Sequence, residues 1–224
     1  MQNSPMKLIN QRIGLILGMI AAIALTAGAM IAATAQAAPA IVGDAAPDFS
    51  VVDSEGNIRT LDEFAGQRVI LEWTNHGCPF VKKHYSEPRT NMQSLQSDYG
   101  SLENTVWLSV ISSAPGKQGY FEADEANAHA TTVGASPDAI LLDPDGVMGK
   151  SYGAQTTPHM FIIDSDENQT LIYNGAIDNK PTANPAHIDS ATNYIISGFE
   201  KLAAGEAIDP GTTKSYGCTV KYAS

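Results

Sequence analysis

The stretch VILEWTNHGCPFV, residues 69–81, runs from an apolar segment into the expected first turn of a helix. The continuous apolar run at residues 69–74 predicts a strand that is covered on both faces of a sheet. Pro79 suits the first helical position, because it has no N–H to leave unpaired and its φ is already helical. Cys78 is therefore expected at the N-terminal end of a helix, where free N–H groups and the helix dipole lower the pKa of a thiol. Such a cysteine is a candidate redox nucleophile.

Strands and helices alternate on both sides of this stretch. The apolar pattern predicts strands at residues 105–111 and 140–142, a hairpin of residues 160–163 and 170–173, and helices at residues 61–64, 79–99 with a break at Pro88, 123–130 and, capped by Asn184, 185–204. This order predicts an α/β fold in which helices flank a central sheet.

The composition is that of an ordinary folded domain. The chain has 224 residues, of which 43% are hydrophobic and 17% are charged, without low-complexity runs or repeats. Its net charge is −11, and because residues 1–37 carry two positive charges and no negative one, the remainder carries −13. A surface this acidic repels phosphates, so we expect no nucleic-acid partner.

Residues 1–37 have the pattern of a signal peptide. A polar, basic start leads into an apolar stretch over residues 13–33, and Ala35-Gln36-Ala37 follows as an A-x-A cleavage site. The alternative is an uncleaved anchor, because an apolar stretch of 21 residues is long enough to span a bilayer. Either way we expect the folded part to be exported, periplasmic or secreted, where a disulfide persists.

Beyond this leader we expect one domain over residues 38–205 and a C-terminal tail over residues 206–224. The tail has no clear periodicity and contains one proline and two glycines. We therefore expect it to be loosely held and able to move. It carries Cys218, the only cysteine besides Cys78.

Two further motifs carry a family resemblance. GDAAPDF at residues 43–49 resembles the opening of peroxiredoxins and of exported thioredoxin-like reductases, and TPHMFIID at residues 157–164 resembles the loop that presents a cis-proline to the active cysteine in the thioredoxin superfamily. The resemblance covers residues 43–175. It implies a thioredoxin-like fold, with a mixed sheet flanked by helices, in which Thr157 and a cis Pro158 lie beside the reactive thiol.

The chain lacks residues on which the reactions of thioredoxins and of standard peroxiredoxins depend. Thioredoxins have a second cysteine in C-x-x-C, but Val81 stands there in this chain. Peroxiredoxins have Thr or Ser three residues before the reactive cysteine and an arginine far downstream, whereas this chain has Asn75 and no arginine after Arg89. The chain is most similar to a peroxiredoxin-like branch.

The resemblance and the two cysteines together suggest a thiol-dependent oxidoreductase with an antioxidant role. Cys78 would attack a hydroperoxide or a protein disulfide, and Cys218 is the candidate resolving thiol. No cofactor is required, but an external thiol donor or electron-donor protein must supply electrons. Three alternatives stay open: a structural Cys78–Cys218 bridge, two unlinked thiols, and a non-enzymatic binding module.

Three more side chains are candidates for a supporting role. His76 would stabilise the thiolate or shuttle a proton, His159 would approach the same place, and Trp73 would pack beside the thiol. The alternatives are exposed loop histidines and a tryptophan that only fills the core. A thiolate and two histidines also match a soft copper or zinc site, although ligands drawn from separate loops favour no metal. Lys82 and Lys83 are expected on the solvated face of the helix.

Overall fold

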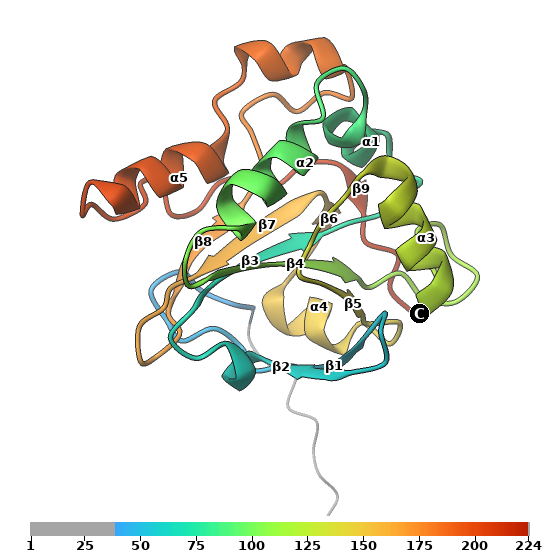
Figure 1. Cartoon of the computed structure of the whole chain (residues 1–224), viewed down its shortest axis with the longest axis horizontal. Helices are drawn as coiled ribbons and strands as arrows, with labels where there is room; N and C mark the ends of the chain where they lie inside the picture. Colours follow the sequence, from blue (N-terminus) through green and yellow to red (C-terminus); the bar gives the residue numbers. More distant parts are fainter. Residues whose placement is uncertain (1–38, 224) are drawn as a thin grey trace, which may run out of the picture. The chain divides into compact units, whose positions relative to one another are not determined.

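The computed structural model describes residues 39–223, so the signal peptide expected at residues 1–37 lies outside the described residues. Strands and short helices alternate along this part of the chain (Figure 1). They are β1 (Ser50–Asp53), β2 (Ile58–Thr60), η1 (Leu61–Phe64), β3 (Arg68–Trp73), α1 (Pro79–Tyr85), α2 (Asn91–Leu95), η2 (Gln96–Gly100), β4 (Thr105–Ile111), α3 (Ala123–Val133), β5 (Ala139–Leu142), α4 (Val147–Tyr152), β6 (Thr156–Thr157), β7 (His159–Ile163), β8 (Leu171–Gly175), η3 (Pro185–Ser190), α5 (Tyr194–Ala203) and β9 (Cys218–Thr219).

Seven strands form the central sheet, in the order β2-β1-β5-β4-β3-β7-β8. The three central strands β3, β4 and β5 run parallel, whereas β7 and β8 on one side and β1 and β2 on the other pair antiparallel. β6 and β9 form a separate two-stranded sheet. The predicted α/β fold with a mixed sheet and flanking helices is confirmed.

The two faces of β3 contribute to two apolar clusters, because successive side chains of a strand point to opposite faces. Val69 and Leu71 pack with Met148 and Tyr152 of α4 on one face. Ile70 packs on the other face with side chains of α2 and α5. Figure 1 shows α4 on one side of the sheet and α2 on the other. β3 is thereby buried on both faces.

The helix expected to start at residue 79 breaks where predicted. α1 ends at Tyr85, α2 begins at Asn91, and Pro88 lies between them. Proline lacks the N–H that a continuing helix needs, and its ring clashes with the preceding turn. α1 is therefore a short helix of seven residues directly after Cys78.

The single helix expected at residues 185–204 is wrong, because the structure has two helical segments there. η3 ends at Ser190, and Ala191 is extended with ψ 145°. Asn193 then starts α5, since its side chain accepts hydrogen bonds from the N–H groups of Ile195 and Ile196. An asparagine that caps in this way begins a new helix.

The C-terminal tail packs against the domain, which differs from the loosely held segment that the sequence predicts. Val220 is buried, and its N–H donates to the Gln155 carbonyl at 3.0 Å. The Tyr222 hydroxyl donates to the Ala154 carbonyl at 2.7 Å. Turn-forming residues give the tail no helical period, but backbone pairing and two apolar side chains still hold it in place.

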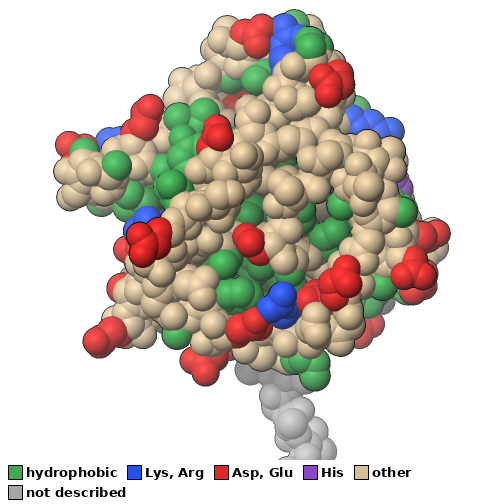
Figure 2. Space-filling model, viewed as in Figure 1, with side chains coloured by type: hydrophobic (Ala, Val, Ile, Leu, Met, Phe, Trp, Pro, Cys, Tyr) green, Lys and Arg blue, Asp and Glu red, His purple; other side chains and the backbone are tan. Residues whose placement is uncertain are grey.

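The surface of the described residues is acidic. Figure 2 shows acidic side chains scattered over the visible face and fewer lysines and arginines, in keeping with the net charge of −11. Within residues 39–223, no helix is long and apolar enough to cross a membrane. The apolar stretch at residues 13–33 that suggested an anchor lies outside this range.

Candidate active site

Cys78 is the residue that caps the N-terminal end of α1, immediately after the turn that follows β3. Asn75 shapes this turn: its carbonyl accepts from the Cys78 N–H at 2.9 Å, and its side-chain oxygen accepts from the Gly77 N–H at 2.9 Å. The Asn75 amide also donates to the Gln118 carbonyl at 3.2 Å. Asn75 thus supports the turn, and Pro79 occupies the first helical position as predicted.

The peptide bond between Thr157 and Pro158 is cis. The Cys78 thiol donates to the Thr157 carbonyl at 3.2 Å, so the proline loop lies beside the thiol. Both features agree with the geometry that the family resemblance implies. The loop leads into β7, which is paired with β3, and this pairing brings the loop to the end of β3 that carries Cys78.

Cys218 reaches the same place from the C-terminal tail. It lies in β9, opposite Thr157 of β6. Gly217 permits this approach, because a Cβ there would lie 2.0 Å from the Thr157 carbonyl oxygen, and its φ is 132°. Both cysteines are free thiols, and they lie close enough for each to shift the pKa of the other. The fold therefore brings together two thiols that are 140 residues apart in the sequence.

The two thiols have opposite acidities. Burial acts to raise the pKa of Cys78, but hydrogen bonds from the Cys218 thiol, the Val81 N–H and Thr157 together lower this pKa below its ordinary value. Burial, and then the hydrogen bond and charge of Cys78, raise the pKa of Cys218 to about 11. When the pair loses a proton, Cys78 is therefore the thiol that ionises first, and Cys218 keeps its proton.

Access to the two sulfurs also differs. Cys78 is fully buried, whereas Cys218 is partly exposed. Reagents that approach from solvent therefore meet Cys218 first. A reagent reaches the Cys78 sulfur only when the residues that cover it move aside.

Trp73 belongs to the core. Its indole N–H donates to the Ser112 hydroxyl at 2.9 Å, and its ring packs against Phe161 with centroids 4.9 Å apart. The side chain is fully buried at the end of β3. Trp73 thus supports the site through the packing of β3, which is the alternative that the sequence left open.

The two histidines have partners of their own. The His76 ring stacks on Phe121 with centroids 3.8 Å apart, and His159 bonds to the Asn174 side-chain oxygen at 2.9 Å. Burial lowers the pKa of His159 to about 4, although the hydrogen bond to Asn174 opposes it, so His159 is neutral. In the described part of the chain, no group of three His, Cys, Asp or Glu side chains is placed to hold a metal ion.

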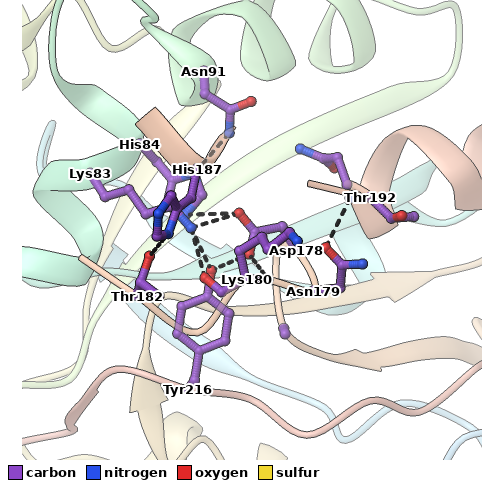
Figure 3. A network of polar contacts seen from close by, with 12 residues as sticks. Lys83, His84, Asn91, Asp178, Asn179, Lys180, Thr182, His187, Thr192 and Tyr216 are labelled. Atoms are coloured by element: carbon purple, nitrogen blue, oxygen red, sulfur yellow. Dashed lines mark hydrogen bonds and ion pairs between the residues drawn. The ribbon is translucent and has the colours of Figure 1, made fainter. Parts of the chain in front are cut away.

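Sequence reasoning was wrong about Lys83, which was expected on the solvated face of α1. Its side chain is buried, and its ammonium bonds to the Asp178 carboxylate at 2.8 Å (Figure 3). Lys82, the preceding residue, is exposed as expected. Two adjacent lysines in a helix point in different directions, and the sequence does not show which of them meets a buried carboxylate.

A buried carboxyl group, that of Glu72 in β3, was also missed. It accepts hydrogen bonds from the side chains of Tyr85, Gln96, Trp107 and Ser109. Burial raises the pKa of Glu72 to about 7, against the lowering effect of these hydrogen bonds. The signal available in the sequence was a single acidic residue inside an otherwise apolar strand.

The sheet, the helix-capping cysteine and the cis-proline loop define a thioredoxin-fold redox protein. The chain belongs to the Redoxin family, whose model matches residues 41–191. Family and fold place it among the thiol oxidoreductases of the thioredoxin superfamily. No curated protein matches the chain significantly in sequence.

Two solved structures resemble most of the chain. A hypothetical protein from Sinorhizobium meliloti 1021 is 22% identical with a TM-score of 0.65, over 84% of this chain and 98% of that one. An uncharacterized conserved protein from Geobacillus kaustophilus is 20% identical with a TM-score of 0.66, over 82% and 93% of the two chains. These likenesses show that this chain shares its fold with the two solved structures over nearly their whole length.

Proposed function

We propose that the protein cycles between a Cys78/Cys218 dithiol and a disulfide, reducing a small hydroperoxide in the process. The observation that carries this proposal is the juxtaposition of the two thiols with the lower pKa at Cys78. A dithiol of unequal acidity supplies both a nucleophile and a resolving thiol.

The oxidative half-reaction needs only these two residues and the peroxide. The Cys78 thiolate attacks the terminal peroxide oxygen, the O–O bond breaks, and the alkoxide leaves with a proton as an alcohol. Cys78 is then a sulfenic acid. The Cys218 sulfur attacks the Cys78 sulfur, water leaves, and the disulfide forms. The peroxide has gained two electrons, and the two thiols have lost two.

Burial favours a small oxidant over a protein disulfide. A protein disulfide would have to bring its own sulfur to within bonding distance of Cys78, which is fully buried next to β9. A hydroperoxide is small enough to reach it with little rearrangement. Exchange with protein disulfides is therefore the second candidate, and it requires β9 to move.

The reductive half-reaction returns the dithiol at the expense of an external thiol donor. A donor thiolate attacks the disulfide, a second donor thiol completes the exchange, and the donor leaves as its own disulfide. Neither half-reaction uses a cofactor.

Mass spectrometry of the purified protein tests this proposal. After one equivalent of hydroperoxide, we expect the loss of two hydrogens and a peptide pair linked through Cys78 and Cys218, and a thiol reductant should reverse both. A permanent bridge that resists the reductant, or a protein that stays a dithiol in peroxide, would contradict it. The first outcome would indicate the structural disulfide of a binding module.

We also propose that the protein is exported. The support is the basic start, the apolar run at residues 13–33 and the Ala35-Gln36-Ala37 site. The N-terminal residue of the protein recovered from cells tests this: we expect Ala38. A protein that begins at Met1 and remains with membranes would indicate an anchor, and one that begins at Met1 in the cytosol would contradict export.

A further inference from the structure

A buried charged cluster connects α1 to the C-terminal tail. The Lys83 ammonium donates to the Asp178 carboxylate at 2.8 Å, to the Lys180 carbonyl at 2.9 Å and to the Tyr216 hydroxyl at 3.2 Å. Tyr216 donates in turn to the other Asp178 oxygen at 2.5 Å. Figure 3 shows these side chains converging from α1, from the loop after β8 and from the tail.

The ion pair and Tyr216 have all their protons hydrogen-bonded, whereas Nε2 of the nearby His84, 3.8 Å from the Asp178 carboxylate, has no hydrogen-bond partner. An ammonium group has three protons, and all three protons of Lys83 have acceptors. Burial, and then the hydrogen bond and charge of Asp178, raise the pKa of Tyr216, so its hydroxyl keeps its proton and remains a donor. Nearby His84 is neutral, because burial and the Lys83 charge lower its pKa to about 4. One cation and one anion therefore balance.

Stability alone does not account for such a cluster. Both side chains of the ion pair are almost fully removed from water, at 0% exposure for Lys83 and 2% for Asp178. Desolvation of a buried ion pair often exceeds the attraction between its charges, and apolar side chains of similar volume serve stability as well or better. Charged hydrogen bonds supply a defined geometry that apolar side chains do not, because they require particular distances and directions.

The cluster joins the two segments of the chain that carry the thiols. Lys83 lies five positions after Cys78 on α1, and Tyr216 lies two positions before Cys218. The Tyr216 ring also packs edge-on against Phe80 of α1, with centroids 5.9 Å apart. The tail is therefore fixed to α1 directly before the residue that must meet Cys78.

We propose that Lys83, Asp178 and Tyr216 are positioning residues that hold the Cys218 sulfur against Cys78 and so favour closure of the disulfide. This inference rests on the proposed dithiol cycle. Closing a bond between two thiols of one chain is favoured by their effective concentration, which rises when the chain is held in the bonding geometry.

Tyr216→Phe is the main test, because it keeps the ring on Phe80 and the Lys83–Asp178 ion pair. The equilibrium between dithiol and disulfide is measured in glutathione buffers, which gives the effective concentration of one thiol for the other. We expect this concentration to fall roughly tenfold, the loss expected for one hydrogen bond to a charged group. After excess peroxide, we expect a larger fraction of Cys78 as sulfinic acid relative to disulfide, because the sulfenic acid waits longer for Cys218.

Tyr152→Phe is the matched control. It removes a buried tyrosine hydroxyl that donates to the Pro47 carbonyl at 2.7 Å and to no residue of the tail. We expect a lower melting temperature in this variant and a wild-type effective concentration. If Tyr216→Phe behaves in the same way, its role is structural and the inference is overturned.

A double variant separates positioning from stability. Lys83→Met with Asp178→Leu removes both charges but also the acceptor of the Tyr216 hydroxyl and of the Lys180 N–H, so we expect closure to weaken at least as much as in Tyr216→Phe at a melting temperature no lower than that of Tyr152→Phe. A wild-type effective concentration in this variant would also overturn the inference. If the wild-type protein forms no Cys78–Cys218 disulfide in any buffer, the proposed function itself fails.

Discussion

Cys78 and Cys218 lie side by side, yet the parts of the molecule that carry them differ. Cys78 caps a helix behind a buried strand, is fully buried, and has a lowered pKa. Cys218 lies in a two-residue strand of the tail, is partly exposed, and has a pKa raised to about 11. In the proposed cycle this difference separates two tasks: the buried, more acidic Cys78 reacts with a small oxidant, and the partly exposed Cys218 meets a thiol donor.

The largest expected effect comes from Cys78→Ser. Peroxide turnover should fall to the rate measured without protein. The serine hydroxyl is a much weaker nucleophile than a thiolate, and Cys218 is protonated at neutral pH. Serine is close to cysteine in size, so the circular dichroism spectrum should match that of the wild type. Steady-state peroxide consumption measures the effect, and full turnover in this variant would remove Cys78 from the mechanism.

Cys218→Ser should leave the first oxidation of Cys78 but slow every later turnover. Without a resolving thiol, the sulfenic acid accumulates or proceeds to sulfinic acid. Single-turnover and multiple-turnover kinetics, with mass spectrometry of Cys78, measure the two steps separately. Melting curves of both serine variants serve as the control: equal losses of stability without any redox phenotype would indicate a structural staple, worth roughly 4–5 kcal/mol for a loop of this length.

The third prediction concerns the reductive step. When the oxidised protein meets glutathione, the mixed disulfide should form on Cys218, because its sulfur is the accessible one and Cys78, with the lower pKa, is the better leaving group. Acid quenching followed by peptide mapping locates the glutathione. Equal labelling of both residues, or labelling of Cys78 alone, would show that exposure does not direct the attack.

The smallest effect is a shift in pH dependence. Because the pKa of Cys78 is lowered, its reaction with iodoacetamide should persist below the ordinary thiol range and be lost as the pH falls through the lowered pKa. Cys218→Ala removes one of the hydrogen bonds that lower this pKa, so the midpoint should move to higher pH. A midpoint that stays in place would mean that backbone groups and Thr157 stabilise the thiolate without help from the Cys218 side chain.

The regular elements near the site were largely predictable, because their causes are local. The apolar run ending at Trp73, Pro79 at the first helical position and Pro88 as a breaker act within a few residues of themselves. The strand at residues 105–111 has the predicted bounds. The cis bond at Pro158 came from the family resemblance, since local propensity favours the trans form.

The errors share a cause as well. The helix expected at residues 185–204 is divided by the capping side chain of Asn193, which competed successfully with a continuous apolar pattern. The composition of the tail predicts a loosely held segment, although β9 is paired with β6. In both places an interaction outside the periodic pattern decided the structure.

The sequence by itself determined that this protein has a cysteine at the start of a helix, an α/β fold and a second cysteine in the tail, whereas the thioredoxin-like form of the fold came from the family resemblance. Those conclusions follow from patterns in which neighbouring residues interact. Only the tertiary structure decided that Cys218 meets Cys78, that Lys83 points inward to Asp178, and that Cys78 has the lower pKa of the two thiols. These depend on which distant segments share a buried space, where burial and hydrogen bonds shift acidities in ways that no local pattern records.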